Sequence, residues 1–392
     1  MKYIRVLIIS ISVLFITGCN KTIVDELPKD YYLELNDSVV DVYSDSKLSD
    51  IIDKTNITYK DDKLDTESVG EKIYDLEFNV GKSKYLYHIK YKVKDLSKPR
   101  ILSSGDRYVT VNSDVYLCDY IMYGDEYDNE PVCRVEGEYD LNKVGVYDIK
   151  YIVTDSSNNE AIFETKLNVI PESKNNSTRR KTTTYFSDVL NTHKTDKTKL
   201  GIDVSRWQGN VDYDKVKSAG AEFVIMRIGV ESKQGEEIGM DSKYKENIKK
   251  AKKAGLKVGV YLYSIALNKD TAMSHAEWVI KALDGEELDL PVVFDWENWS
   301  KWQEYKLSFH DINEIADTFI KTIEKTGYKG MLYSSKFYLE NIWENKNDYP
   351  VWLAHYTNET NYKGKYKIWQ MCNDGVIDGI NGDVDIDIMY LD

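Results

Sequence analysis

The sequence predicts a multidomain chain in which two small all-β modules precede an α/β domain, an irregular TIM-like (β/α) barrel. Three observations support this prediction. Residues 31–170 alternate apolar and polar residues, residues 171–197 are poor in apolar residues, and residues 198–392 alternate short apolar strands with amphipathic helices. A chain of 392 residues is long enough to give each of two or three domains its own core.

The N-terminus has the features of a targeting segment. Two basic residues precede the apolar stretch of residues 6–16, which is too short to span a bilayer comfortably. The run ITGC at 16–19 resembles a bacterial lipobox, in which the cysteine is lipidated. The resemblance implies a signal peptide over 1–18, a lipid on Cys19, a tether over 19–30 and an extracytoplasmic, membrane-anchored lipoprotein at the bacterial cell surface. The alternative is an ordinary secretory signal that ends near a cysteine.

Charge composition narrows the choice of partners. The chain has 66 Asp and Glu against 52 Lys and Arg, a net charge of −14, and the two signs are interspersed. Such a chain has no general electrostatic attraction to nucleic acid or to anionic lipid headgroups. Tyrosine is abundant at 31, with 8 Trp, which fits both strands and surfaces that stack on sugars. We therefore expect no nucleic-acid partner.

Cysteine and histidine do not form a metal-binding pattern. Cys118 and Cys133 lie in one predicted module and could pair in an oxidising compartment, whereas Cys372 has no obvious partner. The sequence has no CxxC, and its five histidines form neither HxH nor HExxH. No metal site and no cofactor are predicted.

Two β modules are predicted over residues 31–97 and 98–170. An internal sequence repeat supports the division, because the similar segments IKYKVKDLS at 89–97 and IKYIVTDSS at 149–157 stand 60 residues apart. The second module resembles the immunoglobulin-like modules of bacterial surface proteins, and the first, predicted as β-sandwich-like, matches more loosely. The residues that carry the resemblance are Gly145, Tyr147, Tyr151, Asp155 and Asn159. The resemblance implies spacers or weak binding modules.

A flexible linker is predicted between the modules and the barrel. Residues 171–197 are dominated by Ser, Thr, Asn and Lys, with one helical turn near 185–191. The composition changes at once after this stretch, so the α/β domain is expected to begin at residue 198.

The α/β domain contains eight candidate strands. They cover 200–205, 223–229, 257–264, 291–297, 330–335, 351–356, 367–371 and 384–391. Candidate helices lie near 212–219, 243–254, 270–283, 309–326 and 336–344. Alternating strands and helices imply a parallel sheet, and eight strands imply a closed barrel. After the fifth strand the connections become too short for full helices, so the late helices should be incomplete.

The segment PVVFDWENW at 291–299 ends a buried strand with two acids, Asp295 and Glu297. Residues i and i+2 of a strand project from the same face, about 6.5–7 Å apart at Cα. Two like charges at this distance, next to aromatic rings that exclude water, should raise one pKa and leave the other lower. A lone DxE, however, is more often two solvated acids in a strand-to-loop turn, so the rest of the chain must decide.

Other polar and aromatic residues lie near the same ends of the predicted strands, where barrels collect their chemistry. Asp203 comes from the first strand and Asp385 enters on the eighth. The candidate substrate-binding residues are Tyr261, Tyr263, Tyr333, Trp352, Tyr356, Trp369 and Gln370. Each aromatic residue could serve the core as well as a sugar.

Six blocks across residues 198–392 resemble those of the glycoside hydrolase family 25 lysozymes, in the family's order and spacing. The blocks cover 201–229, 251–264, 291–297, 326–335, 351–356 and 367–387. The resemblance implies the family's irregular barrel and hydrolysis of the β-1,4 bond between N-acetylmuramic acid and N-acetylglucosamine in peptidoglycan. The implied partners are peptidoglycan glycan strands and, through the lipid, a membrane.

The resemblance also implies catalytic roles. Glu297 matches the proton donor, Asp295 the partner carboxylate, Asp203 the acid of the opening block and Asp385 the acid of the closing block. Glu297, between Trp296 and Trp299, is the better candidate for a raised pKa, while Asp295 could stay ionised. For the family, retention assisted by the substrate's acetamido group is proposed, with the aspartate steadying that group.

Three departures from the family pattern concern subsite detail. Leu262 takes the position of a usual histidine, which would remove a polar contact, Trp296 replaces an aliphatic residue, and Cys372 follows an altered WQ block. Two other readings remain open: a catalytically idle wall-binding lipoprotein, or a metal-dependent hydrolase that uses the four acids as ligands.

Overall fold

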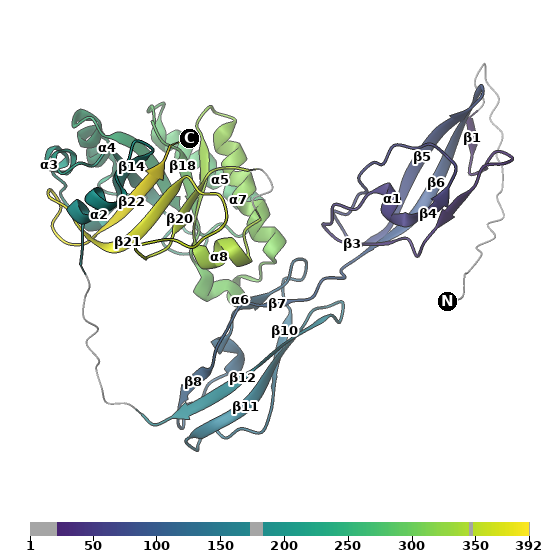
Figure 1. Cartoon of the computed structure of the whole chain (residues 1–392), viewed down its shortest axis with the longest axis horizontal. Coiled ribbons are helices and arrows are strands. Elements are labelled where there is room, and N and C mark those ends of the chain that lie inside the picture. The colour runs from purple at the N-terminus through teal and green to yellow at the C-terminus, as the bar shows by residue number, and fades with distance from the viewer. Residues whose placement is uncertain (1–21, 173–182, 345–347, 392) are drawn as a thin grey trace. The chain divides into compact units, whose positions relative to one another are not determined.

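The computed structural model describes residues 22–172, 183–344 and 348–391 (Figure 1). The predicted signal peptide, the lipidation site at Cys19 and part of the predicted linker lie outside the described residues. Contacts divide the chain into two units, residues 1–99 with 153–161, and residues 100–152 with 162–392. Among the described residues, no helix is both long enough and apolar enough to cross a membrane.

The first unit is built on a long antiparallel hairpin of β5 (Gly70–Val80) and β6 (Ser83–Lys94). Strands β1 (Thr22–Val24) and β3 (Val39–Asp41) both run parallel to β6. Strand β2 (Leu33–Leu35) pairs with β4 (Ile52–Thr55), and a single-turn helix, α1 (Leu48–Ile51), precedes β4. The prediction named no helix here; α1 forms because its first and last residues, three apart, share one buried face.

The second β module has a four-stranded sheet in the order β10–β11–β12–β8. Its strands are β8 (Arg107–Thr110), β10 (Val132–Glu136), β11 (Gly145–Thr154) and β12 (Glu160–Ile170). A separate antiparallel pair is formed by β7 (Arg100–Ile101) and β9 (Tyr123–Gly124). A disulfide joins Cys118, in the turn η1 (Leu117–Tyr120), to Cys133 in β10.

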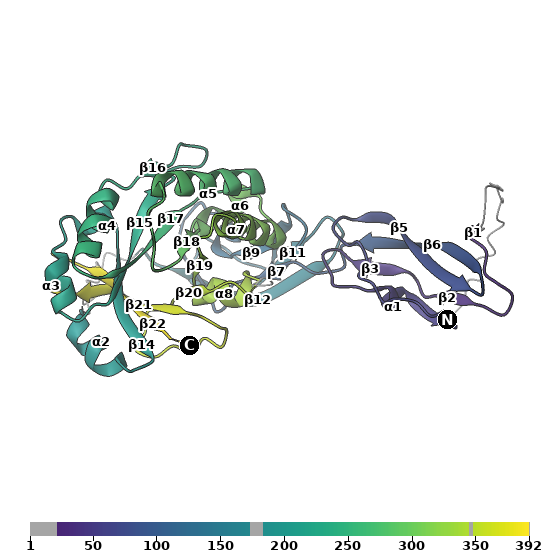
Figure 2. The same ribbon diagram turned by 90° about the horizontal axis from the view of Figure 1, so that it is seen from above.

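The C-terminal part is a closed barrel of eight strands in the order β14–β15–β17–β18–β19–β20–β21–β22, and β22 returns to β14 (Figures 1 and 2). The strands are β14 (Thr198–Val204), β15 (Phe223–Val230), β17 (Lys257–Tyr263), β18 (Val292–Asp295), β19 (Gly330–Ser335), β20 (Val351–Ala354), β21 (Ile368–Val376) and β22 (Val384–Tyr390). Short strands β13 (Thr184–Tyr185) and β16 (Gly239–Met240) add to β21 and β15.

One strand departs from the expected parallel sheet. β22 runs antiparallel to both β14 and β21, because it follows β21 without a crossover helix. Its first residues therefore lie at the edge where the other seven strands end. This geometry brings Asp385 directly opposite Asp203.

Helices cover the outside of the first five strands (Figure 2). They are α2 (Phe186–His193), α3 (Tyr213–Ser218), α4 (Tyr244–Lys253), α5 (Lys269–Leu283), α6 (Trp302–Tyr305), α7 (Phe309–Glu324) and α8 (Lys336–Asn341). Five of them match predicted helices, whereas none was predicted at residues 302–305. Residues 186–193, predicted as flexible linker with one helical turn, form a helix whose Phe186 and Val189 are buried in the barrel's core. The longest, α7, begins with a capping box between Ser308 and Asp311. Its buried side chains, including Ile312 and Phe319, follow one stripe.

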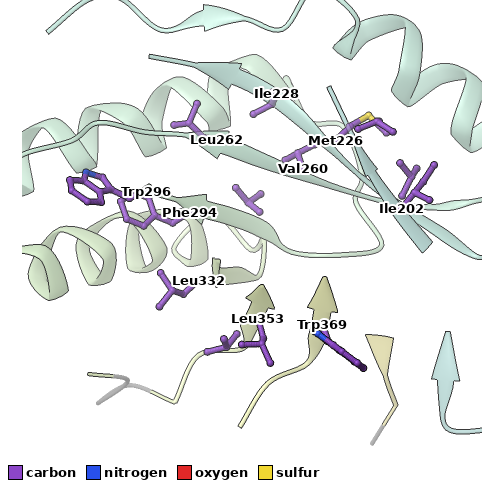
Figure 3. Close-up of a cluster of buried hydrophobic side chains, with 14 of the residues drawn as sticks. Ile202, Met226, Ile228, Val260, Leu262, Phe294, Trp296, Leu332, Leu353 and Trp369 are labelled. Carbon is purple, nitrogen blue, oxygen red and sulfur yellow. The ribbon is translucent and has the colours of Figure 1, made fainter. Parts of the chain in front are cut away.

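Alternate residues of the strands form two apolar layers. One fills the barrel and includes Ile225, Val293 and Met331, all fully buried. The other lies between strands and helices and includes Phe294 and Leu332 (Figure 3). The direction of a side chain on a strand therefore decides whether it faces the barrel interior or the helices.

Candidate active site

Strand β18 ends at Asp295, and the chain then places Trp296 and Glu297 on opposite sides. Trp296 is fully buried in the layer between strands and helices, where its Nε1 donates to the carbonyl of Ala266 at 3.1 Å (Figure 3). Asp295 is 3% exposed, and its carbonyl accepts a hydrogen bond from the backbone N–H of Ser264 at 2.8 Å. Trp296 is thus core, and the two acids share the other side of the strand.

The carboxyls of Asp295 and Glu297 are hydrogen-bonded to each other. Burial, then the charge of Glu297, raises the pKa of Asp295 well above its ordinary value. Burial also raises the pKa of Glu297, although Glu297 as a whole residue is exposed and Asp295 is buried. The two acids therefore lose their protons in steps that belong to the pair and not to either residue alone.

This arrangement differs from the sequence expectation that Asp295 stays ionised while Glu297 keeps the proton. Asp295 is the more buried of the two acids, so desolvation acts more strongly on it. Within the described residues, Asp295 Oδ1 is buried and has no hydrogen-bond partner.

Asp203 and Asp385 face each other across strands β14 and β22. Burial raises the pKa of Asp385 to about 7, and the charge of Glu297 adds to this shift. Burial and the charge of Asp385 raise the pKa of Asp203 well above its ordinary value, while a hydrogen bond from Gln370 opposes the rise. The four predicted acids therefore act on one another electrostatically in one part of the barrel.

Gln370, on β21, links the acids to two tyrosines. Its Nε2 donates to Asp203 Oδ2 at 2.8 Å. Its Oε1 accepts hydrogen bonds from the hydroxyls of Tyr333 at 2.8 Å and Tyr356 at 3.1 Å. Tyr333 is buried, whereas Tyr356 is 52% exposed, so the network runs from the buried acids to the surface.

The structure adds two groups that the sequence reasoning missed. Asp387 is fully buried, its Oδ1 accepts from Trp352 Nε1 at 2.8 Å, and it hydrogen-bonds Asp203. Arg227 forms an ion pair with Asp241 at 2.8 Å, and its charge lowers the pKa of Asp295 against the effect of burial. Both could have been recognised in the sequence, since Asp385 and Asp387 repeat the i, i+2 spacing of Asp295 and Glu297, and Arg227 is a lone charge within an apolar strand.

The remaining predicted residues divide by strand face. Tyr261 lies in the barrel interior, 6.1 Å from Trp352 between ring centroids, and the charge of Asp203 acts on it. Tyr263 lies opposite Asp295 in the register of β17 and β18, and burial raises its pKa to about 12. Trp352 is itself 2% exposed, so its contact is with Asp387.

Two sequence interpretations are corrected by the direction of side chains. Trp369 is 2% exposed in the layer between strands and helices, and its Nε1 donates to the carbonyl of His355 at 2.8 Å, so it is not placed to contact substrate. Leu262, expected to remove a polar contact from a subsite, belongs to the same outer layer and is fully buried. Alternation along a strand explains both, because their neighbours Gln370 and Tyr261 face the other way.

The site combines an interacting pair of carboxyls, further buried acids and one exposed tyrosine, Tyr356, at the carboxyl edge of a barrel. One acid of such a pair can give a proton to a leaving oxygen while the other opposes positive charge at the reacting carbon. A barrel with this arrangement of acids meets the chemical requirements of glycoside cleavage.

Comparison with known proteins places the barrel in a family of glycoside hydrolases. Residues 202–380 match the family model of the glycosyl hydrolases family 25. The chain is 31% identical over 196 residues to the uncharacterized protein YegX of Escherichia coli O157:H7, which covers 48% of this chain and 68% of that relative. It is 31% identical over 189 residues to the autolytic lysozyme of Clostridium acetobutylicum, covering 48% and 54% respectively. The chain belongs to glycosyl hydrolases family 25.

Among solved structures, a family 25 glycosyl hydrolase from Bacillus anthracis matches with a TM-score of 0.44 and 21% identity, over 51% of this chain and 93% of that one.

Proposed function

We propose that this chain is a peptidoglycan muramidase that hydrolyses the β-1,4 bond between N-acetylmuramic acid and N-acetylglucosamine. One observation carries the proposal: the hydrogen-bonded pair of Asp295 and Glu297, both with raised pKa, at the carboxyl edge of a family 25 barrel. The names of its relatives, an autolytic lysozyme and Lysozyme M1 of Streptomyces globisporus, support the substrate class.

Glu297 is the proposed general acid. Glu297 is the exposed residue of the pair, and its raised pKa keeps it protonated closer to neutral pH than an ordinary glutamate. In the proposed reaction it gives its proton to the oxygen that leaves with N-acetylglucosamine as the bond to C1 of N-acetylmuramic acid breaks. Water later adds to that C1 and returns a proton to Glu297.

Asp295 is the proposed partner. The side chains of Asp295 and Glu297 interact with each other, which favours retention by this pair, since inverting pairs stand about 6.5–9.5 Å apart to leave room for a water. We propose retention, in which the acetamido group of N-acetylmuramic acid closes on C1. Asp295, ionised once substrate separates the pair, steadies the positive charge of that intermediate.

Asp203, Asp385 and the tyrosines are proposed to position the sugar. Tyr356 is exposed and tied through Gln370 to Asp203, so its hydroxyl can meet a sugar without losing its orientation. Asp385 is partly exposed at the start of β22 and can accept a hydrogen bond from a sugar hydroxyl or amide.

The proposed location is the outer face of a bacterial membrane. A lipid on Cys19 would anchor the chain, and the residues between Cys19 and the barrel would let the site reach glycan strands. The family 25 membership supports an extracytoplasmic substrate.

Two alternatives remain to be tested against this proposal. A wall-binding protein without activity would have little reason to keep like charges buried beside each other, because that arrangement costs stability. A metal-dependent hydrolase would use the acids as oxygen ligands, and its activity would be lost on chelation.

The deciding experiment is mass spectrometry of the muropeptides that the chain from residue 20 onward releases from purified peptidoglycan. We expect new reducing ends on N-acetylmuramic acid, unaffected by EDTA. Glu297→Gln keeps the shape of the side chain without the acidic proton and should abolish the release.

A matched control is Glu324→Gln, which makes the same chemical change at the exposed end of α7 and should leave release unchanged. Undiminished release by Glu297→Gln would refute the assignment of the acid. Reducing ends on N-acetylglucosamine would refute the assignment of the bond.

A further inference from the structure

The segment that follows Glu297 lies outside the barrel strands, and its Trp299 stacks on Tyr338 of α8 at 3.9 Å between ring centroids. After Glu297 the chain forms a short turn η3 (Trp299–Lys301) and α6, and it reaches Lys306, where φ is 51°, before α7 begins. We name residues 298–311 the acid-following segment. Its aromatic rings pack in series: Trp296 on Trp299 at 4.7 Å, Trp299 on Trp302 at 5.9 Å and Trp302 on Phe309 at 5.5 Å between centroids.

The far end of this ring series contacts the second β module. The guanidinium of Arg100 lies 4.1 Å from the centroid of the Phe309 ring, and its NH1 donates to the carbonyl of Asn341 at 2.7 Å. A Cβ added to Gly124 would lie 2.7 Å from Phe309 Cζ and 3.0 Å from Trp302 Nε1. Only a glycine therefore allows β9 to approach these rings so closely.

Backbone groups of the module also satisfy the start of α7. The first N–H groups of a helix have no acceptor within the helix. Here the carbonyl of Asp125 accepts from Phe309 N at 2.7 Å, and that of Glu126 accepts from His310 N at 3.3 Å. The module thus supplies part of the N-terminal cap of the helix that ends the acid-following segment.

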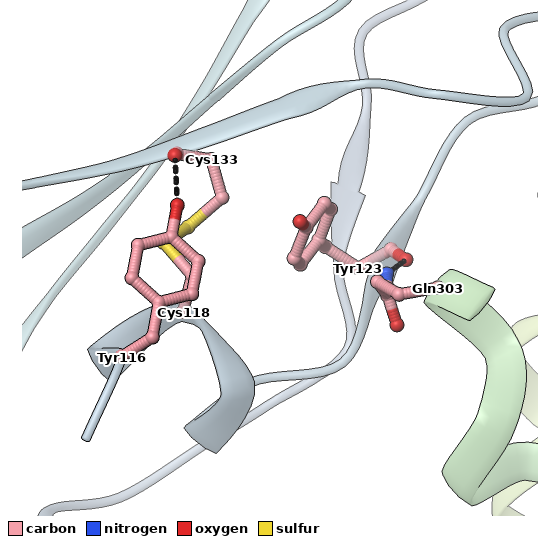
Figure 4. Close-up of a disulfide and its surroundings, with 5 residues drawn as sticks. All are labelled: Tyr116, Cys118, Tyr123, Cys133 and Gln303. Carbon is pink, nitrogen blue, oxygen red and sulfur yellow. Dashed lines mark hydrogen bonds between the residues drawn. A yellow bond between two sulfur atoms is a disulfide. The ribbon is translucent and has the colours of Figure 1, made fainter. Parts of the chain in front are cut away.

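Side chains complete the contact. Asn129 Nδ2 donates to the carbonyl of Lys306 at 3.0 Å and to Asp311 Oδ2 at 2.7 Å. Gln303 Nε2 donates to the carbonyl of Tyr123 at 2.6 Å (Figure 4). Asn129 thereby holds both the residue of positive φ and the acid of the α7 capping box.

The module residues between 123 and 129 lie in one loop closed by a covalent bond. Cys118 and Cys133 are joined by a disulfide, and residues 119–132 form the loop between them, which we name the docking loop (Figure 4). Closing a loop of this size removes unfolded conformations and is worth about 3 kcal/mol in the chain-entropy model. Without the bond, the docking loop would lose order, and its carbonyls would no longer be held toward α7.

We propose that the docking loop of the second β module is a brace for the acid-following segment, and that its disulfide is required to hold Glu297 in its catalytic position. The inference rests on the proposed function. It assigns to this module a part in catalysis, with Asn129 as a positioning residue. The prediction of a spacer module accounts for none of these contacts.

The brace predicts a particular kinetic effect. If the segment loosens, Glu297 is displaced and better hydrated, so its transition-state contact weakens more than substrate binding does. A misplacement of about 1 Å costs up to about a hundredfold in rate. Better hydration also lowers the pKa of Glu297, and the alkaline limb of the kcat profile moves to lower pH.

The test compares Asn129→Ala with Asn142→Ala in the chain from residue 20 onward. Asn142 hydrogen-bonds only within the module, to Asp140, and is a matched control. We expect Asn129→Ala to lower kcat about tenfold with KM within about twofold, and to move the alkaline limb to lower pH. Cys118→Ala/Cys133→Ala should do the same, and Asn142→Ala should do neither.

Hydrogen exchange of peptides that span 299–311 gives a readout independent of activity. Exchange there should be faster in Asn129→Ala and in the cysteine double variant than in Asn142→Ala. Unchanged exchange in both variants would refute the brace. Faster exchange with unchanged kcat and pH profile would refute its coupling to Glu297. If the unmodified chain releases no new reducing ends, the proposed function fails, and exchange alone still decides whether the loop braces the segment.

Discussion

Trp296→Phe tests whether the residue between the two acids acts on stability or on the acids themselves. The indole is fully buried on the helix side of β18, donates to the carbonyl of Ala266 at 3.1 Å and packs against Trp299. Phenylalanine keeps an aromatic ring on this side but removes the N–H donor and part of the ring.

The expected cost follows from these contacts. Leaving the carbonyl of Ala266 without its donor costs about 1–3 kcal/mol. The smaller ring leaves a cavity of roughly 40 Å³, which adds about 1 kcal/mol at about 24 cal/mol per Å³. The sum of about 2–4 kcal/mol corresponds to a fall in Tm of about 5–15 °C for a domain of this size.

The measurement is thermal unfolding followed by near-ultraviolet circular dichroism, together with the pH profile of kcat. Because Trp296 faces away from the acids, we expect lower stability with the alkaline limb of kcat in place. Trp207→Phe is the matched control, since Trp207 is 74% exposed and the same change should leave Tm unaltered. A shifted pH profile at unchanged Tm would show that Trp296 sets the pKa of the acids and would refute this reasoning.

Three further predictions concern other buried groups. Gln370→Glu replaces the amide that donates to Asp203 by a carboxyl, so we expect kcat to fall about a hundredfold with little change in fold. Steady-state kinetics and circular dichroism measure the two effects, and a near-normal kcat would mean that the amide donor is dispensable. The pKa of Asp385 is about 7 in the folded chain against about 3.9 when unfolded, so the folded state binds more protons and stability falls as pH rises from about 4 to 7. Asp385→Asn should therefore raise the free energy of unfolding at pH 8 by about 1–2 kcal/mol while activity is lost. Urea unfolding at pH 4 and at pH 8 measures this, and the reasoning is wrong if the variant and the unmodified chain differ equally in stability at both pH values. Cys372 is buried with its thiol pKa raised to about 12, so native protein should not react with a thiol reagent at pH 8. Protein lipidated on Cys19 should expose one reactive thiol on unfolding and three after unfolding and reduction. Three reactive thiols before reduction would exclude the Cys118–Cys133 bond.

Strands and helices of the barrel were predictable because their signals are local. Each predicted strand overlaps one of the eight barrel strands, and the stripe of α7 that includes Ile312 and Phe319 is buried as its spacing indicates. The antiparallel β22 was not predictable, because a short connection after β21 says only that a crossover helix is absent. The direction of β22 then depends on which strands it pairs with to close the barrel.

The side of the strand from which a side chain projects explains which site residues could be predicted from the sequence and which could not. The i, i+2 rule predicts that Asp295, the last residue of β18, and Glu297 project to the same side, and it also applies to Asp385 and Asp387 within β22. It does not say which side faces the barrel interior. Trp369 therefore could not be distinguished from its neighbour Gln370 as a site residue until both were seen.

By itself, the sequence determined the order of the elements, the apolar pattern that separates strands from helices, and the presence of several acids near strand ends. Those properties depend on residues close together in the chain. Only the tertiary structure decided which acids interact with one another, which aromatic residues are core, and that a loop of the second β module caps α7 behind Glu297. These depend on burial and on contacts between residues far apart in sequence, such as Asn129 and Lys306, which no local pattern records.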